Sequence, residues 1–178
     1  MTNINFIFPE IFISLSLMIL LLIGVFKKNS SGLIYFLSIV TLLISLGIIF
    51  NSPQDQNIYL FDNSYKIDSL SILMKVITIV SGIFVLISSY SYAKLERISD
   101  IEYSILILCS ILGMLVMIGS YDLIVFYIGL ELQSLSLYVL AAFNRNKINS
   151  SEAGLKYFVL SALSSGLLLY GCSLIYGF

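Results

Sequence analysis

The sequence predicts an all-α membrane protein with six transmembrane helices, and three observations carry this prediction. Hydrophobic residues make up 59% of the 178 residues and charged residues only 11%, with a mean hydropathy of +1.03. A soluble domain has about a quarter charged residues and could not bury this much apolar surface. The apolar residues occur in runs of about 20, which is long enough to cross a hydrocarbon core about 30 Å thick. Inside a bilayer such runs must be helical, because the backbone finds no other hydrogen-bond partners.

Polar clusters divide the apolar runs into six predicted spans. Pro9 suits the first position of a helix, and Glu10 complements the helix dipole there. The polar segment Gln54–Asp68 separates the second span from the third and is the longest predicted loop. The whole chain, 1–178, is expected to form a single transmembrane domain. The predicted spans are Pro9–Phe26, Leu33–Phe50, Ser69–Tyr92, Tyr103–Gly119, Leu123–Phe143 and Glu152–Tyr176.

The distribution of basic residues predicts how the chain is oriented. The loops after the first, third and fifth spans carry six Lys and Arg residues, whereas the opposite side carries only Lys66. Cytoplasmic loops are enriched in Lys and Arg. Both termini and the Gln54–Asp68 loop are therefore predicted to lie outside. The six residues are Lys27, Lys28, Lys94, Arg97, Arg145 and Lys147.

Glu131 is a single carboxylate in the middle of the fifth predicted span, with about nine residues on either side. At about 1.5 Å rise per residue it lies roughly 13 Å from both ends, near the bilayer midplane. A charge there costs about 2.5–3.5 kcal/mol, and such residues usually mark ion or proton pathways. Tyr127, Ser134 and Tyr138 fall on the same helix face, so this stripe is predicted to face protein or water rather than lipid. The alternative is a protonated Glu131 that only joins helices through hydrogen bonds.

Lys156 is the predicted partner of Glu131, because a nearby lysine would keep a buried carboxylate charged. It lies one turn into the sixth span, at i+4 from Glu152, after a predicted helix cap at Asn149. The alternative is a local ion pair between Glu152 and Lys156, with the lysine reaching to the membrane interface.

Three further charged residues receive structural interpretations. Lys75 lies about six residues, roughly 9 Å, into the third span, where its ammonium group can still extend to the interface. Glu10 and Asp122 lie at the ends of predicted spans and are interpreted as interfacial.

The composition also argues against several classes of protein. The chain has no histidine, and Cys109 and Cys172 lie far apart in apolar runs. Iron–sulfur clusters need several thiolates and zinc sites usually need grouped Cys and His, so no metal, haem or cluster is expected. The net charge of -1 predicts no nucleic-acid partner. The start, MTNINFIFPEIF, lacks the basic residues of a signal peptide, so the first span is expected to be retained. Frequent Asn, Ile, Phe, Tyr and Lys fit an AT-rich genome such as that of an organelle.

Two segments resemble a known family. GLELQSLSLYVLAAF contains Glu131, and SSEAGLKYFVLSALSSGLLLYGCSLIYG contains Lys156. Both are similar to the antiporter-like subunit 2 family of mitochondrial NADH dehydrogenase, respiratory complex I, whose bacterial counterpart is subunit N. The resemblance is strong over about Tyr103–Gly177. It implies a membrane-arm subunit that contributes to proton translocation coupled to NADH:ubiquinone electron transfer, with Glu131 as the acid of the fifth helix and Lys156 as the lysine of the sixth.

The resemblance also carries expectations about cofactors and partners. FMN, the iron–sulfur clusters and ubiquinone would belong to other subunits, so no redox chemistry is expected in this chain. Residues 1–100 would form three leading helices, and residues 101–178 the first three helices of an inverted five-helix repeat. The family also has a seventh-helix lysine that pairs with the acid of the fifth helix. We therefore expect a split subunit that a second chain completes, beside other membrane-arm subunits in the mitochondrial inner membrane or, alternatively, the bacterial inner membrane.

Two other functions remain open. The first is a subunit of a multisubunit cation/proton antiporter, which belongs to the same family of membrane proteins. The sequence segments LQSLSLYVLAAF and EAGLKYF favour subunit 2 over this alternative. A non-conducting scaffold subunit of complex I would keep the helices without pumping. A partner chain that carries the seventh-helix lysine would distinguish the pump from the scaffold.

Overall fold

Six long helices and one short hairpin make up the computed structural model, which describes residues 7–26, 31–51, 58–95, 100–144 and 147–177. Each helix is long and apolar enough to cross a membrane. The prediction of six spans is therefore confirmed within this part of the chain. The helices are α1 (Phe8–Phe26), α2 (Ser31–Phe50), α3 (Ser69–Leu95), α4 (Asp100–Gly119), α5 (Leu123–Ala141) and α6 (Ile148–Gly177).

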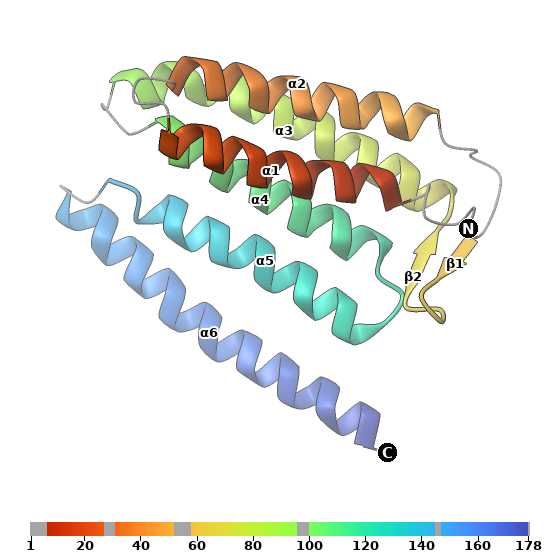
Figure 1. Cartoon of the computed structure of the whole chain (residues 1–178). Helices are drawn as coiled ribbons and strands as arrows, with labels where there is room; N and C mark the ends of the chain where they lie inside the picture. The colour runs from red at the N-terminus through yellow and green to blue at the C-terminus, as the bar shows by residue number, and fades with distance from the viewer. Residues whose placement is uncertain (1–6, 27–30, 52–57, 96–99, 145–146, 178) are drawn as a thin grey trace.

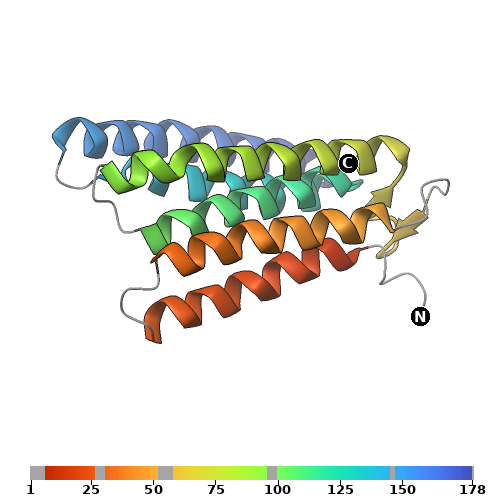
Figure 2. The same ribbon diagram turned by 90° about the horizontal axis from the view of Figure 1, so that it is seen from above.

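α4 is the central helix of the bundle. It packs against α1, α2, α3 and α5, whereas α6 packs mainly against α5. Figures 1 and 2 show α1 and α2 on one side of the bundle and α6 on the opposite side. The fully buried apolar side chains come from α1–α4 and include Ile13, Leu42, Ile79, Leu108 and Leu115. The hydrophobic core therefore belongs to the first four helices.

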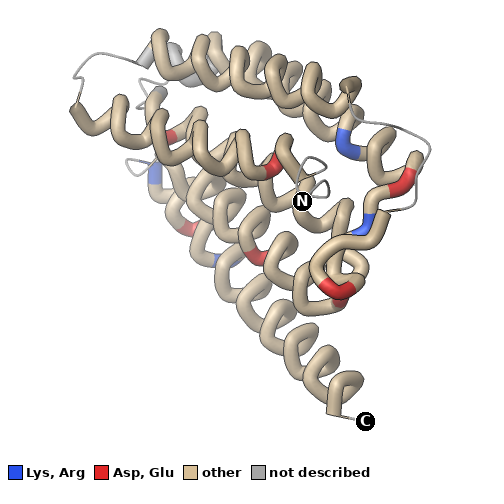
Figure 3. Tube along the Cα trace, turned by 45° about the vertical axis from the view of Figure 1, so that its right-hand side comes forward, with Lys and Arg blue, Asp and Glu red and all other residues tan. Residues whose placement is uncertain are grey.

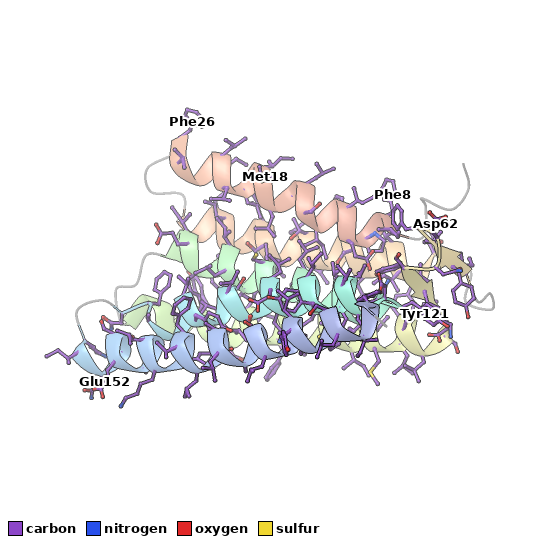
Figure 4. The ribbon with its side chains drawn as sticks, turned by 90° about the horizontal axis from the view of Figure 1, so that it is seen from below. Phe8, Met18, Phe26, Asp62, Tyr121 and Glu152 are labelled. Carbon is purple, nitrogen blue, oxygen red and sulfur yellow. The ribbon has the colours of Figure 1, made fainter. Side chains whose placement is uncertain are left out.

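The outer faces of the helices are apolar, as lipid requires. Figure 4 shows Phe8, Met18 and Phe26 along α1, and all three side chains are exposed. Charged residues are sparse along the helices (Figure 3). This distribution of apolar and charged side chains fits a bundle surrounded by hydrocarbon.

α4 and α5 approach each other through two glycines. A Cβ atom at Gly113 would lie 2.6 Å from the backbone nitrogen of Gln133 and 2.8 Å from the carbonyl oxygen of Gly129. A Cβ atom at Gly129 would lie 2.8 Å from the backbone nitrogen of Met117. Small residues of this kind let two membrane helices bring their backbones into contact. The turn of α5 that holds Glu131 is therefore placed directly against α4.

The predicted loop Gln54–Asp68 contains a β-hairpin that the sequence analysis missed. β1 (Ile58–Leu60) pairs antiparallel with β2 (Tyr65–Ile67). The turn between them has Phe61, Asp62 and Asn63 at positive φ, a conformation that Asp and Asn tolerate better than most residues. Residues 52–57 of the predicted loop lie outside the described residues.

The hairpin is attached to the connection between α4 and α5. The carbonyl oxygen of Ser64 accepts hydrogen bonds from the backbone N–H groups of Tyr121 and Asp122, at 3.0 and 3.3 Å. Tyr65 also forms an isolated bridge with Ser120. These contacts supply acceptors for N–H groups at the start of α5 that have no partner within their own helix.

α6 begins at Ile148, four residues before the predicted span at Glu152, so Asn149 lies inside the helix and is not its cap. The hydroxyl of Ser150 donates to the carbonyl of Ala141 at 2.9 Å, which fixes this first turn against the end of α5. Hydropathy marks where an apolar run begins, but a helix can continue into polar residues beyond it, and here it does.

The predicted orientation stays a prediction. Figure 1 shows that α1 begins and α6 ends at the end of the bundle that carries the hairpin. The prediction that this end lies outside rests largely on residues that fall outside the described part of the chain, namely Lys27, Lys28, Arg97 and Arg145.

Candidate functional site

Glu131 lies inside α5, eight residues after Leu123 and ten before Ala141. These separations correspond to about 12 and 15 Å along the helix axis. The side chain is half-buried, and its Oε1 atom is buried without a hydrogen-bond partner among the described residues. Glu131 therefore combines a central depth with an oxygen that no described donor reaches.

The polar stripe around Glu131 connects α5 to α6 at one of its ends. Tyr138 is buried, and its hydroxyl donates to the hydroxyl of Ser161 on α6. Its ring meets that of Tyr157 edge to face, with 4.8 Å between centroids. The Ser134 hydroxyl donates to the backbone carbonyl of Glu131 at 3.1 Å and so serves its own helix.

Tyr127, the fourth member of the predicted stripe, is half-buried on α5. The part of α5 around Glu131 thus offers polar side chains, none of which hydrogen-bonds Oε1 of the carboxylate. All four members of the predicted stripe lie on α5, as their spacing predicted, and Tyr138 adds a contact with α6.

Lys156 does not pair with Glu131 in the structure. Its Nζ atom lies 2.5 Å from Oε1 of Glu152, and the two side chains are 69% and 57% exposed. The local pair, which was the alternative in the sequence analysis, is therefore the arrangement that the structure contains. Residues at i and i+4 share a helix face, so this pair needs no neighbouring helix. Figure 4 places Glu152 at the end of the bundle opposite Asp62 and Tyr121.

A second charged cluster was missed from the sequence. The Nζ atom of Lys75 on α3 lies 2.7 Å from Oε1 of Glu10 on α1, and both side chains are buried. The hydroxyl of Tyr65 on β2 donates to the same oxygen at 2.9 Å. Glu10 lies in the first turn of α1, at the end of its span as predicted, and Lys75 extends toward it. The sequence analysis missed that the two side chains form a buried ion pair. The partners lie 65 positions apart on different helices, so no local spacing could reveal the pair.

The residues that lead into α3 are held by a reciprocal cap. The backbone N–H of Ser71 donates to Oδ1 of Asp68 at 2.8 Å, and the N–H of Asp68 donates to Oγ of Ser71 at 2.9 Å. Lys66 lies 3.0 Å from the same carboxylate. The N–H of Ser71, followed by Lys66, lowers the pKa of Asp68 below its usual range. Asp68 therefore acts as an ionised cap at the start of α3.

Tyr65 occupies a buried position beside Glu10. Burial, followed by the charge and the hydrogen bond of Glu10, raises the pKa of the Tyr65 phenol far above its usual value. The Tyr65 phenol therefore stays protonated, and its hydroxyl donates to Glu10. Among the described residues, no group of three or more His, Cys, Asp and Glu side chains could hold a metal ion.

Comparisons with known proteins agree on one class. A protein-family model described as "NADH:quinone oxidoreductase/Mrp antiporter, TM" matches residues 120–178. In fold, the chain is similar to a chain of respiratory complex I from Thermus thermophilus, with a TM-score of 0.79 and 24% identity over 95% of this chain and 36% of that one. It is also similar to a chain of an archaeal membrane-bound sulfane sulfur reductase, with a TM-score of 0.75 and 20% identity over 96% of this chain and 36% of that one. At these identities the two structures show the fold alone.

The sequence relatives are more specific. The chain is 66% identical to NADH-quinone oxidoreductase subunit N of Pelagibacter ubique, over 100% of this chain and 38% of that protein. It is 47% identical to subunit N of Bartonella bacilliformis, over 97% of this chain and 35% of that protein.

The family model and the sequence relatives together define an antiporter-like membrane chain of the NADH:quinone oxidoreductase class. Within that class, the chain belongs to the family of NADH-quinone oxidoreductase subunit N and corresponds to its N-terminal part. It spans little more than a third of the length of these relatives. The resemblance inferred from the segments around Glu131 and Lys156 is confirmed.

Proposed function

We propose that this chain is a membrane-arm component of NADH-quinone oxidoreductase and contributes to proton translocation coupled to quinone reduction. One observation carries the proposal: Glu131 lies about 12 Å from the nearer end of α5 and has a buried oxygen without a described partner. An intramembrane acid is a functional-site candidate by default. The 66% identity to subunit N supports the assignment to this complex.

In this proposal Glu131 carries a proton between two sides of the membrane. A protonated carboxyl group is neutral and therefore far less costly at this depth than a carboxylate. Moving one charge against a potential of about 150 mV requires roughly 3.5 kcal/mol. Separating Glu131 from a lysine, from about 4 to 8 Å, changes their attraction by only about 2 kcal/mol at an effective dielectric near 20. One pair is therefore insufficient, and further charged groups must contribute.

We propose that those groups lie on helices beyond the six described, in the remainder of the subunit, whether this belongs to the same polypeptide or to a second chain. The exposed faces of α5 and α6 support this proposal, because α6 buries only Gly154 and Cys172. Leu160, Leu163 and Leu167 of α6 are exposed and offer a continuous apolar surface. FMN, the iron–sulfur clusters and ubiquinone are proposed to lie in other subunits. The sequence relatives are bacterial, which favours the bacterial inner membrane over the mitochondrial one.

Lys156 remains part of the proposed pathway as the sixth-helix lysine of the family. This role requires its ammonium group to leave Glu152, at 2.5 Å in the structure, and to face a group on another helix. The exposed position of the pair makes this change inexpensive, because exposed ion pairs contribute only about 0–1 kcal/mol.

Glu131→Gln tests the proposal in the assembled complex. The substitution keeps the size of the side chain and removes the group that carries the proton, so we expect normal assembly with a lower ratio of protons moved to electrons transferred. Glu102→Gln is the matched control, since it makes the same change at an exposed position on α4, and should leave the ratio unchanged. A normal ratio for Glu131→Gln in assembled complex would rule out a direct role for this acid.

The family model also names the Mrp antiporter, so cation/proton exchange is the second candidate function. Native electrophoresis of mildly solubilised membranes, with NADH dehydrogenase staining and mass spectrometry of the active band, separates the candidates. The chain and the remaining helices should both appear in that band, in the same polypeptide or in a second one. The chain in the band without those helices would favour a scaffold, and its absence from the band would favour the antiporter.

A further inference from the structure

Glu10 is a second buried acid, and the proposed function does not use it. Its side chain is 6% exposed and that of Lys75 is 3% exposed. Figure 1 shows α4 between α1, which carries Glu10, and α5, which carries Glu131. The chain therefore places two acids in its membrane-spanning part, on different sides of its central helix.

The depth of the Glu10 cluster can be measured along α4. Gly113 packs against the turn of α5 that holds Glu131. The hydroxyl of Tyr65, which donates to Glu10, lies 3.5 Å from the carbonyl oxygen of Leu115. Leu115 is two residues from Gly113, about 3 Å along the helix. A Cβ atom at Gly119, the last residue of α4, would lie 2.2 Å from the same hydroxyl, and Glu10 is in the first turn of α1. The Glu10 cluster therefore lies between the level of Leu115 and the end of the bundle that carries the hairpin.

The two oxygens of Glu10 have unequal surroundings. Oε1 accepts from Nζ of Lys75 at 2.7 Å and from the hydroxyl of Tyr65 at 2.9 Å. Oε2 is buried, and no donor among the described residues reaches it. An ionised carboxylate accepts hydrogen bonds through both oxygens, and a buried charged acceptor without a donor is strongly unfavourable. A proton on Oε2 removes that charge while Oε1 keeps both of its donors.

Lys75 has a second source of stabilisation that does not depend on the charge of Glu10. Its Nζ atom lies 5.1 Å from the centroid of the Tyr65 ring, within the range of a cation–π contact. The other charged pair near the hairpin, Lys66 with Asp68, is satisfied at 3.0 Å. The described part of α2 carries no charged side chain, and α4 contributes a backbone carbonyl to the cluster. Among the described residues, no second acid competes for Lys75.

Tyr65 separates the cluster from the end of the bundle that carries the hairpin. Its ring lies against Gly119, where a Cβ atom would come within 1.9 Å of the ring carbon Cζ. The hydroxyl at the far end of the ring reaches Glu10. Because Gly119 has no side chain, it leaves room for the Tyr65 ring beside Glu10.

We propose that Glu10 is a proton-binding site, paired with Lys75 and closed toward the hairpin by Tyr65. The carboxylate takes up one proton on Oε2, an O–H bond forms, and no bond breaks. Lys75 remains an ammonium group, so the charge of the site rises by one. The inference goes beyond the proposed function, because Glu10 can take up this proton whether or not Glu131 takes part in pumping.

Carbodiimides test this proposal because they react with protonated carboxyl groups. The acid proton moves to a carbodiimide nitrogen while the carboxyl oxygen bonds to the central carbon. The adduct then rearranges to an N-acylurea. Alternatively, the ammonium group of Lys75 gives up a proton to a base, and the free amine displaces the urea and forms an amide with Glu10. The full protein in its native membranes, without NADH, is treated with dicyclohexylcarbodiimide over a range of pH, and the products are identified by peptide mass spectrometry.

We expect modification of Glu10, or its cross-link to Lys75, to increase up to about tenfold for each unit by which the pH falls. Glu10→Gln should abolish both products. The Glu152–Lys156 pair is the internal control, because it has the same chemistry in an exposed position and should react with a water-soluble carbodiimide. Two outcomes would overturn proton binding: an unmodified Glu10 at every pH in a sample in which Glu131 reacts, or a yield that does not vary with pH.

Two variants test the closure by Tyr65. Gly119→Ala displaces the ring, so Glu10 should become reactive toward the water-soluble carbodiimide. Tyr65→Phe keeps the ring and removes only the hydroxyl, so Glu10 should stay protected from that reagent. Protection of Glu10 in membrane-inserted Gly119→Ala protein would refute the closure, whereas the pH dependence in the unaltered protein tests proton binding by itself.

Discussion

The chain contains two Glu–Lys pairs of similar geometry in very different surroundings. Within α1–α4, Lys75 and Glu10 lie 2.7 Å apart with 3% and 6% of their side chains exposed. On α6, Lys156 and Glu152 lie 2.5 Å apart with 69% and 57% exposed. Breaking a buried pair costs about 3–5 kcal/mol because the remaining charge is left uncompensated, whereas an exposed pair contributes about 0–1 kcal/mol. Burial, and not distance, therefore decides what each pair does.

The same difference extends to the helices that carry the pairs. α1–α4 enclose a continuous apolar core, and their charged pair is buried between α1, α3 and the hairpin. α6 leaves most of its apolar side chains exposed and packs mainly against α5. The first four helices are thus held together by contacts within the chain, while the α5–α6 side presents surface to lipid or to other subunits.

Lys75→Met should have the largest effect. It leaves Glu10 buried without its cation, so we expect the free energy of unfolding in detergent to fall by about 3–5 kcal/mol. Denaturant titration of the purified protein measures the change. Lys156→Met is the matched control, with an expected loss below about 1 kcal/mol. Equal losses for the two variants would show that burial does not separate the pairs.

Gly113→Ala should have the second-largest effect on stability, because it disrupts the contact between α4 and α5. The added methyl group meets the backbone of α5 at 2.6 Å, and backbone cannot move aside as a side chain can. We expect a loss of about 1–3 kcal/mol, typical of overpacking. Gly47→Ala is the control within α2, where a Cβ atom would meet nothing within 4 Å. Its stability should be unchanged or slightly higher, and a similar loss in both variants would argue against the close helix contact.

Asp68→Ala removes the cap of α3 and should cost about 1 kcal/mol. The cap also predicts a pH dependence. The pKa of Asp68 is lowered in the folded protein, so its contribution is fully present above the pKa of the unfolded chain and is lost as the pH falls through the lower, folded value. Acid titration of unfolding should show this loss in the unaltered protein. An Asp68→Ala variant with the same acid dependence would contradict the assignment.

Glu152→Gln should have the smallest effect on stability, within about 0.5 kcal/mol, because the exposed pair is a local i,i+4 contact. The thermal unfolding temperature of the purified protein is a sufficient measurement. A decrease as large as that of Lys75→Met would show that α6 depends on this pair in a way that its exposure does not suggest.

The six helices could be predicted from the sequence because each consists of a long apolar run between polar clusters. The position of Glu131 followed from the same runs, since depth in a helix is a matter of counting residues. The boundaries were less accurate. α6 starts at Ile148 because the hydrogen bonds of the turn around Ser150, and not hydropathy, determine its first residue.

The hairpin and the buried pair could not be predicted in the same way. β1 and β2 have three residues each, too few for a pattern of alternation, although Asp62 and Asn63 were turn residues that could have indicated it. Glu10 and Lys75 meet because α1 and α3 both pack against α2 and α4. Their pairing is a property of the bundle, and neither helix alone contains a sign of it.

The contacts of Ser64 and Tyr65 with residues 119–122 can form only late in the synthesis of these six helices. Ribosomes add residues from the N-terminus, so Glu10, Tyr65 and Lys75 all exist before the end of α4 has been synthesised. The contact between the Tyr65 ring and Gly119 can form only after residue 119 has been added to the chain. Tyr121 and Asp122, which donate hydrogen bonds to Ser64, are added two and three residues later. The contacts that attach the hairpin to the bundle can therefore be completed only after the residues that lead into α5 have been synthesised.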